Sequence, residues 1–446
     1  MCFFIIIYTE LLYKKESDNM QMKNKLKSEK GFAMTVYITT AVITFTVILG
    51  AVFLLSATTR KDQLRTLIKI KEVYEQSNSK KEEIYMEQKE KLPTTFDTKP
   101  YYPDNTFVKI AGTGLTNGLV IQDSNGNEYV WIEVPKSLYA NNDYNTETTT
   151  ADQKPASSTD YEKIEYCLHK YTDYYRGGTK YKDEYYSDET TGLTSTQYTE
   201  LKQKMLKSVY ENGGFWIGRY EAGIEKNRTG SGNITVAPVS KQGTAEKPIY
   251  PYNYVTCSQA QTLANMLTTE NYTSSLMFGV QWNLVLKHIE VREVKKGVAL
   301  ATIQGELKKD SSSWGNYYNA SFTIDRGKYA KYGAISTWYN YDNELEGCVT
   351  YADGTSKKVS ASSNSNAIVL TTGSSEICKK MNIYDLSGNV SEITLEYTTY
   401  SGGPCVYRGG RYSASGVESG YTTAGSGAGG TGSCTSSNGF RVSLYK

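Results

Sequence analysis

Histidine and cysteine supply most metal centres and nucleophilic sites, and this chain of 446 residues has few of them in useful patterns. Only two histidines occur, His169 and His288. They leave almost no material for a zinc centre of two or three histidines or for a catalytic histidine relay. The seven cysteines show no Cys-x-x-Cys spacing typical of zinc. The sequence therefore argues against the common zinc and hydrolase mechanisms.

Oxygen ligands for calcium are suggested by Asp123, Asn125 and Asn127, which are spaced like the start of an EF-hand loop. The twelfth position of such a loop requires Glu, but it is Val134 here. Apolar and polar residues alternate on both sides of an Asn-Gly pair, which is a strong tight-turn signal. We therefore predict a β-hairpin turn at this place.

The charge balance bears on possible partners. Lys and Arg total 49 against 47 Asp and Glu, a formal charge of +2, which gives no overall attraction to nucleic acid. The chain has 39 Tyr and 38 Gly but only 11 Phe, a composition that favours many short strands and turns. An exported protein without nucleic-acid partners is expected.

Residues 32–59 contain no charged side chain and are apolar enough for one transmembrane helix. Four lysines, at positions 23, 25, 27 and 30, come before this stretch. The positive-inside rule then places residues 1–31 in the cytoplasm as a leader and the remaining chain outside. We expect a single-pass protein of the cell membrane with an extracellular C-terminal domain.

The chain after the membrane segment divides into three parts. Residues 60–92 begin with clustered apolar residues and continue with mixed charges, which favours a helical stalk. Prolines mark residues 93–106 as an extended linker. Residues 107–446 form the predicted ectodomain, in which residues 198–210, 256–267 and 281–289 have helical apolar spacing. With a strand beginning at Phe215 and long loops, this predicts a loop-rich α+β fold.

The C-terminal part is rich in Gly, Ser and Tyr between Arg408 and Gly439, and it has almost no aliphatic residues. We expect this segment at the surface, because tyrosine with small polar residues is typical of binding loops. The alternative is a solvated loop without a partner. The predicted ligand-binding residues are Tyr407, Arg411, Tyr412, Glu418 and Tyr421.

Six of the seven cysteines follow the predicted membrane helix, on the side where disulfides can form, and these six can pair in fifteen ways. We predict a bond between Cys405 and Cys434, because it would close the glycine-rich segment at its base. A set of reduced, buried thiols is the alternative.

The leader Met22-Lys-Asn-Lys-Leu-Lys-Ser-Glu-Lys-Gly31, followed by Phe32, resembles the leader of type IV prepilins and pseudopilins. The resemblance implies a bacterial protein cleaved between Gly31 and Phe32, with pilin-like assembly partners. The family's Glu at the fifth mature position is Val36 here. An uncleaved signal anchor is the alternative.

The order of motifs in the ectodomain resembles the formylglycine-generating enzyme family. The motifs are Phe215-Trp-Ile-Gly-Arg-Tyr-Glu-Ala222, Gln281-Trp282, Trp314-Gly-Asn316, Asn382-Ile-Tyr-Asp-Leu-Ser-Gly-Asn-Val-Ser-Glu392, Tyr407-Arg-Gly-Gly410 and Gly439-Phe-Arg-Val442. The resemblance covers residues 107–446 and implies a variant of the C-type lectin fold, preceded here by one long transmembrane and stalk helix.

In that family two cysteines after the Arg-Gly-Gly motif bind copper(I), because soft thiolates select this ion. The matching positions are Ala414 and Ser419, neither of which can ligate copper(I). The expectation is a catalytically inactive domain. A copper-dependent oxidase would require a displaced cysteine pair.

The family also holds a structural calcium ion in the segment that matches Asp385 to Glu392. Carried over by position, the ligands would be the carboxylates of Asp385 and Glu392 and the carbonyl groups of Gly388 and Val390. The alternative is a tight turn whose polar side chains bond to their own backbone.

These inferences lead to a membrane-anchored, adhesin-like or receptor-like protein that binds an extracellular protein or glycan. One alternative is a minor pilin or pseudopilin of a filament, and a second is the copper-dependent oxidase.

Overall fold

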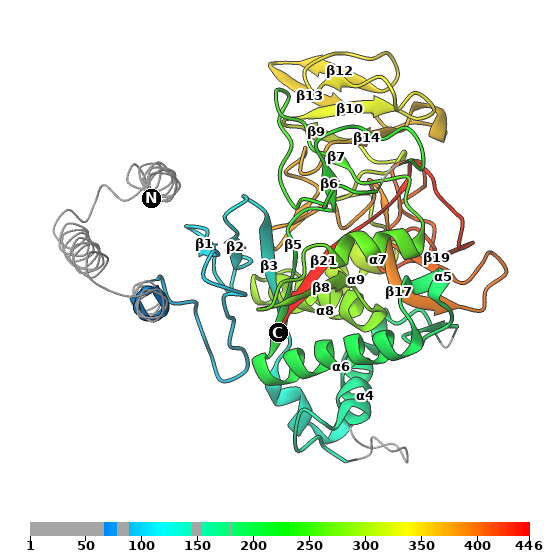
Figure 1. Ribbon diagram of the computed structural model, residues 1–446. Coiled ribbons are helices and arrows are strands. Elements are labelled where there is room, and N and C mark those ends of the chain that lie inside the picture. Colours follow the sequence, from blue (N-terminus) through cyan, green and yellow to red (C-terminus); the bar gives the residue numbers. More distant parts are fainter. Residues whose placement is uncertain (1–66, 78–88, 145–152, 179, 233) are drawn as a thin grey trace, which may run out of the picture. The chain divides into compact units, whose positions relative to one another are not determined.

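The computed structural model describes residues 67–77, 89–144, 153–178, 180–232 and 234–446 (Figure 1). The chain divides into two units, Met1–Lys89 and Glu90–Lys446. In the first unit, residues 67–77 are helical, within the predicted stalk. None of the helices in the described ranges is long and apolar enough to cross a membrane. The predicted leader with Gly31 and Phe32 and the predicted membrane helix of residues 32–59 lie outside the described residues.

The second unit is built on a six-stranded antiparallel sheet. Its strands, in spatial order, are β1 (Val108–Lys109), β2 (Val120–Gln122), β3 (Glu128–Glu133), β5 (Gly214–Gly218), β21 (Val442–Tyr445) and β8 (Thr273–Leu276). The last strand of the chain therefore lies inside this sheet, next to β5 (Figure 1).

The predicted hairpin is confirmed, because β2 and β3 pair antiparallel with Gln122 opposite Glu128. One carboxylate oxygen of Asp123 accepts hydrogen bonds from the backbone N–H groups of Asn125 and Asn127, at 2.9 and 2.8 Å. Its other oxygen accepts the side-chain amide of Asn127 at 2.9 Å. The polar side chains thus stabilise the turn.

A second, five-stranded sheet carries the C-terminal motifs. Its strands are β19 (Ser426–Gly429), β18 (Cys405–Arg408), β17 (Ser391–Thr398) and β20 (Asn438–Phe440), with β4 (Tyr181–Lys182) paired to the end of β17. The pairing of β17 with β20 is parallel, and the other pairs are antiparallel. The glycine-rich segment of residues 409–439 thus leaves this sheet after β18, forms its edge strand β19 and rejoins it at β20.

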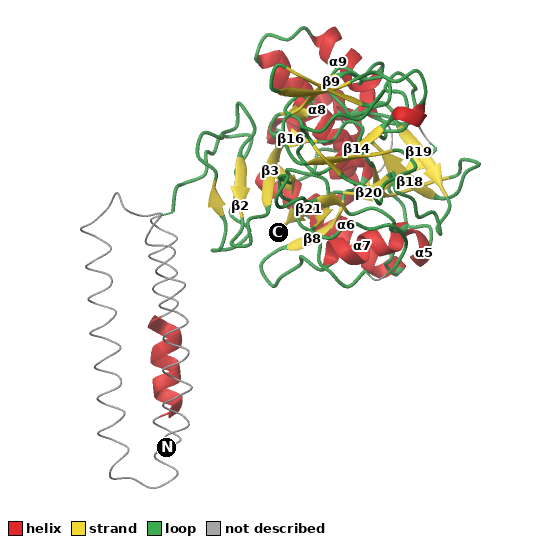
Figure 2. Cartoon of the chain, turned by 90° about the horizontal axis from the view of Figure 1, so that it is seen from above, coloured by secondary structure: helices red, strands yellow, loops and turns green. Residues whose placement is uncertain are grey.

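The three predicted helices are confirmed as α6 (Ser195–Asn212), α7 (Cys257–Asn265) and α8 (Gly279–Lys295). Thr194 and Thr256 form capping boxes at the starts of α6 and α7, and Gly213 ends α6 with φ of 65°. Such caps satisfy backbone groups that a helix end leaves unpaired. α6 contacts β5 and β21, whereas α8 contacts β3 and β17, so α8 packs on strands of both sheets. Figure 2 shows these helices and strands joined by many loops.

The remaining elements are short. The helices are α4 (Tyr161–Tyr171), α5 (Asp188–Thr191) and α9 (Leu300–Lys308). The 3-10 turns are η1 (Lys136–Ala140), η2 (Asn142–Tyr144), η3 (Asp173–Tyr175) and η4 (Asn364–Asn366). The small sheets are β12 (Val349–Ala352), β13 (Thr355–Lys358) and β9 (Phe322–Ile324); β11 (Tyr339–Asn340), β10 (Lys328–Lys331) and β14 (Ile368–Leu370); β15 (Lys379–Lys380) and β16 (Ile383–Tyr384); and β6 (Gly223–Ile224) and β7 (Tyr250–Pro251). The domain is a mixed α and β structure with many loops.

The predicted disulfide between Cys405 and Cys434 is wrong. Cys405, the first residue of β18, is bonded to Cys257, the first residue of α7, with a Cα–Cα distance of 6.4 Å. Cys434 is a half-buried free thiol beyond the end of β19. The bond therefore joins a helix to the second sheet across 148 residues of sequence instead of closing the glycine-rich segment.

Reduction of this bond is expected to lower the free energy of unfolding by about 2–5 kcal/mol, because the bond constrains a long loop of the unfolded chain. The measurement is chemical denaturation of the full chain with and without reductant, together with peptide mapping under non-reducing conditions. Cys434→Ser serves as the control and should change stability little. A cross-linked peptide that contains Cys434 would contradict the assignment.

Candidate functional site

The five predicted ligand-binding residues differ in exposure. Tyr407 and Tyr412 are buried, with 8% and 0% of their surface exposed. The Tyr407 ring packs where a Cβ on Gly429 would lie only 2.4 Å from it, and the Tyr412 hydroxyl lies 3.2 Å from the Ser436 hydroxyl. These two tyrosines therefore support the segment from within, and the prediction that they contact a ligand is wrong.

The expectation that the glycine-rich segment lies entirely at the surface is also wrong in part. Thr422, Thr423 and Ala424 are buried. The N–H of Ala424 donates to the carbonyl of Leu307 at 2.8 Å, and the indole N–H of Trp282 donates to the carbonyl of Thr423 at 3.0 Å. Small residues are needed here because the segment packs directly against neighbouring backbone. Close backbone packing thus accounts for part of the Gly and Ser content.

The longest exposed run of the segment is residues 417–419, where Val417 is 54% exposed. The carbonyl of Glu418 accepts the N–H groups of Tyr421 and Thr422 at 2.8 and 3.1 Å. Arg411, which is half-buried, donates from Nη2 to the Tyr421 hydroxyl at 3.2 Å. Its guanidinium carbon lies 4.9 Å from the centre of the Tyr421 ring. We refer to Arg411, residues 417–419 and Tyr421 as the 411–421 surface.

The two positions that correspond to the copper-binding cysteines give no thiolate pair. Ala414 is buried and Ser419 is exposed, and neither side chain can ligate copper(I). Cys405 is already bonded to Cys257, so Cys434 is the one free thiol in residues 405–439, all of which the structure describes.

The segment predicted to bind calcium is occupied by other interactions. Arg441 Nε lies 3.0 and 3.1 Å from the two carboxylate oxygens of Glu392, and Arg441 Nη2 lies 2.6 Å from Oε1. Asp385 accepts the N–H of Gly373 at 2.7 Å through Oδ2. Because Arg441 already engages both oxygens of Glu392, the predicted set of Asp385, Gly388, Val390 and Glu392 does not fit calcium as the side chains stand. The segment forms a left-handed turn with φ of 57° at Asp385.

Two further buried carboxylate oxygens lie near this ion pair. Glu221 accepts a hydrogen bond from the Asn389 side chain through Oε1, whereas Glu221 Oε2 and Asp385 Oδ1 have no protein hydrogen-bond partner. Burial raises the pKa of Asp385 to about 7, against the opposing effects of the Gly373 N–H and Arg441. Burial, and then the Asp385 carboxylate, raise the pKa of Glu221 well above its ordinary value. One arginine therefore faces three buried carboxyl groups, and burial favours the protonated forms of Asp385 and Glu221.

A second buried ion pair joins neighbouring strands of the same sheet. Arg408, at the end of β18, donates from Nε and Nη2 to the two carboxylate oxygens of Glu396 on β17, at 2.8 and 2.6 Å. Both side chains are almost completely buried. Arg408 Nη1 also donates to the carbonyl of Ala424 at 3.3 Å. This pair therefore fixes the start of the glycine-rich segment.

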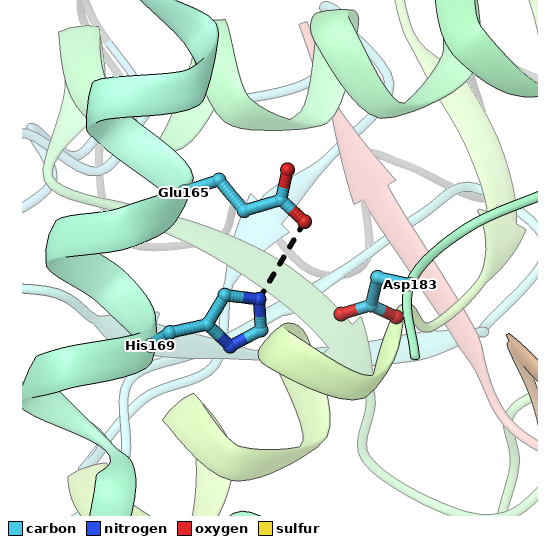
Figure 3. Close-up of side chains that lie close together, drawn as sticks. All are labelled: Glu165, His169 and Asp183. Atoms are coloured by element: carbon cyan, nitrogen blue, oxygen red, sulfur yellow. Dashed lines mark ion pairs between the residues drawn. The ribbon is translucent and has the colours of Figure 1, made fainter. Parts of the chain in front are cut away.

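Glu165, His169 and Asp183 form a third polar cluster, which no sequence motif predicts (Figure 3). Glu165 and His169 lie one turn apart on α4, with Glu165 Oε1 3.5 Å from His169 Nε2. Asp183, which follows β4, accepts the N–H groups of Gly279 and Val280 at 2.6 and 2.8 Å. Burial, and then the Glu396 carboxylate, raise the pKa of Asp183 to about 6. The Glu165/His169 spacing is visible in the sequence, but the approach of Asp183 is not.

Comparisons with known proteins add no assignment to this geometry. No protein-family model, no curated protein and no solved structure matches the chain. The resemblances to prepilins and to formylglycine-generating enzymes therefore stay hypotheses, and the function has to be argued from the residues themselves.

Glu392→Gln is expected to destabilise the domain by about 3–5 kcal/mol, because it leaves the buried guanidinium of Arg441 without a counter-charge. Chemical denaturation of the full chain measures the change. The control is Glu211→Gln, whose exposed partner Lys207 lies 3.6 Å away on α6. It should cost less than about 1 kcal/mol. Equal effects of the two variants would contradict the role of the buried pair.

The pH dependence of stability should reflect Asp385. Its pKa in the folded chain is about 7 against an ordinary 3.8. Its stabilising contribution is therefore complete below the unfolded pKa and is lost as the pH rises through about 7. The free energy of unfolding of the unaltered chain should fall between about pH 5 and pH 8. In Asp385→Asn this fall should be smaller by at least about 1 kcal/mol. Urea denaturation at several pH values tests this, with the exposed Asp342→Asn as a control that leaves the slope unchanged.

Proposed function

We propose that this chain is a membrane-anchored surface protein that binds an extracellular protein or glycan through the 411–421 surface. Its domain would be a catalytically inactive relative of the formylglycine-generating enzymes with a C-type lectin-like fold. The proposal rests on the fixed geometry of an exposed, polar and aromatic surface. The membrane anchor and its orientation rest on the charge pattern of residues 1–59.

Preorganisation is the main support for binding. The N–H of Gly416 donates to the Asn319 side chain at 2.9 Å, and its carbonyl accepts the N–H of Ser311 at 3.0 Å. Residues 417–419 therefore project from backbone that is held on both sides. A surface that is ordered before binding loses less conformational entropy when a ligand binds.

The composition of the 411–421 surface also favours recognition. Tyrosine and arginine are enriched among residues that dominate binding energies. Here the guanidinium of Arg411 stacks on Tyr421, Glu418 adds a negative charge, and Val417 offers a small apolar contact. Such a mixed surface suits a polar ligand with an apolar face, as proteins and glycans have.

Copper chemistry is not part of the proposal, because the 405–439 region offers no second free thiol beside Cys434. Assembly into a pilus-like filament depends on Gly31 and Phe32 and on the segment after them, which lie outside the described residues. The proposed binding function therefore rests on the ectodomain.

The test is a binding screen of the full chain against a glycan array and a panel of immobilised extracellular proteins. The variant Arg411→Ala/Glu418→Ala/Tyr421→Ala should weaken the binding detected with the unaltered chain by at least about tenfold, which corresponds to loss of a binding hot spot. The control variant Lys207→Ala/Glu211→Ala/Tyr351→Ala changes exposed residues elsewhere and should bind normally. Absence of any binding, or equal losses in both variants, would refute the proposal.

A further inference from the structure

We propose that Glu165, His169 and Asp183 form a binding site for one divalent transition-metal ion of the zinc type. Imidazole nitrogen combined with carboxylate oxygen is a ligand set that Zn²⁺ accepts, and three protein ligands leave a position open for water. This cluster has no part in the 411–421 surface, so the two proposals stand independently.

The three side chains converge on one point. One potential ligand atom from each of the three side chains lies within 4.8 Å of the other two. Ligands around a zinc ion at about 2.0–2.2 Å lie roughly 3.5 Å from one another, so side-chain adjustments of about an ångström would complete the set. Glu165 and His169 share one face of α4 because four residues separate them. Asp183 approaches from a different part of the chain (Figure 3).

Neighbouring groups hold both carboxylates of the cluster. The two backbone N–H groups at the start of α8 hold the Asp183 carboxylate, one on each oxygen, and leave further lone pairs on both. Lys202 Nζ lies 2.9 Å from Glu165 Oε2 and 3.2 Å from Glu165 Oε1, so it holds this carboxylate but also competes with an ion for it. Outer hydrogen bonds of this kind orient the ligands of protein metal sites. The Asp183 carboxylate is thus fixed before an ion arrives, whereas an ion would displace the Lys202 ammonium group from Glu165.

The charges of the cluster favour a cation. Asp183 is 94% buried, since only 6% of its surface is exposed, and Glu165 is largely buried beside it. Among the described residues, Lys202 is the one lysine or arginine paired with Glu165 or Asp183. The nearby carboxylate of Glu396 has its own partner, Arg408. Buried charges in proteins are paired or coordinate metals. One negative charge therefore remains for a bound cation when His169 is neutral.

The cluster is open to solvent on one side. The side chains of Glu165 and His169 each keep 18% of their surface exposed, while Asp183 lies deeper. An ion can therefore enter from the solvent side, and a water molecule can complete its coordination. The other histidine, His288, is buried at 4% exposure, and its Nδ1 accepts the N–H of Glu133 at 3.2 Å. It offers no comparable site.

The experiment uses the full chain, purified without a polyhistidine tag and stripped with a chelator. Zn²⁺ binding is measured by calorimetry, and Co²⁺ is used as a spectroscopic probe because its visible absorption reports coordination. We expect one ion per chain and Co²⁺ bands of a four- or five-coordinate site. His169→Gln should raise the Zn²⁺ dissociation constant at least about tenfold and remove those bands. Glu162→Gln, an exposed carboxylate on the same helix, should bind as the unaltered chain does.

Two further variants make the test independent of folding defects and of thiols. Lys202→Met removes the competing ammonium group and should tighten Zn²⁺ binding several-fold, an effect that mere destabilisation would not produce. Cys434→Ser should leave binding unchanged. The proposal fails if the unaltered chain binds no Zn²⁺ or Co²⁺, or if His169→Gln and Glu165→Gln bind as the unaltered chain does.

Discussion

The ion pair between Arg441 and Glu392 is the interaction on which the arrangement of the domain depends. Arg441 is the single residue between β20, in the five-stranded sheet, and β21, in the six-stranded sheet. Its guanidinium binds Glu392 on β17, the carbonyl of Gly218 on β5 and the carbonyl of Tyr384 on β16. The chain therefore crosses from one sheet to the other at a buried charge whose partners come from both. A buried guanidinium persists only where its donors are nearly all satisfied, and this requirement specifies how the two sheets meet.

The pair between Arg408 and Glu396 also fixes part of the chain through a buried arginine, in this case the glycine-rich segment. Arg408 comes directly before residue 409, and Arg441 comes directly after Phe440, so the segment begins and ends at buried arginines. Small residues between them can approach the backbone of residues 307–319 because they have little side-chain volume. At Gly410, an added Cβ would lie 1.9 Å from the carbonyl oxygen of Tyr421. A segment that composition alone describes as flexible is thereby held in one conformation, and its exposed part can present a fixed surface.

The sequence predicted those elements whose signals are local. The alternation around residues 123–127 and the apolar spacing of the three helices act within a few residues, and each predicted element was found. Burial of Tyr407, Tyr412 and Thr423 was not predictable, because tertiary packing decides whether residues of a polar, glycine-rich segment are buried. The partner of Cys405 could not be inferred, since Cys257 is 148 residues away. The approach of Asp183 to Glu165 and His169 could not be inferred either, because it depends on tertiary packing.

The two acidic clusters differ in a way that bears on where an ion can bind. Around Arg441, the carboxyl groups of Glu221, Asp385 and Glu392 are almost completely buried, the guanidinium is fixed on Glu392, and burial raises the pKa of Asp385 and of Glu221. Glu221 Oε2 and Asp385 Oδ1 keep free lone pairs, but the three side chains are at most 1% exposed, so an ion has no direct path to them from solvent. Around His169, the fixed partners are backbone N–H groups and a flexible lysine, and part of the cluster remains exposed. Ion binding requires unsaturated lone pairs and access together, and only the second cluster of these two combines them.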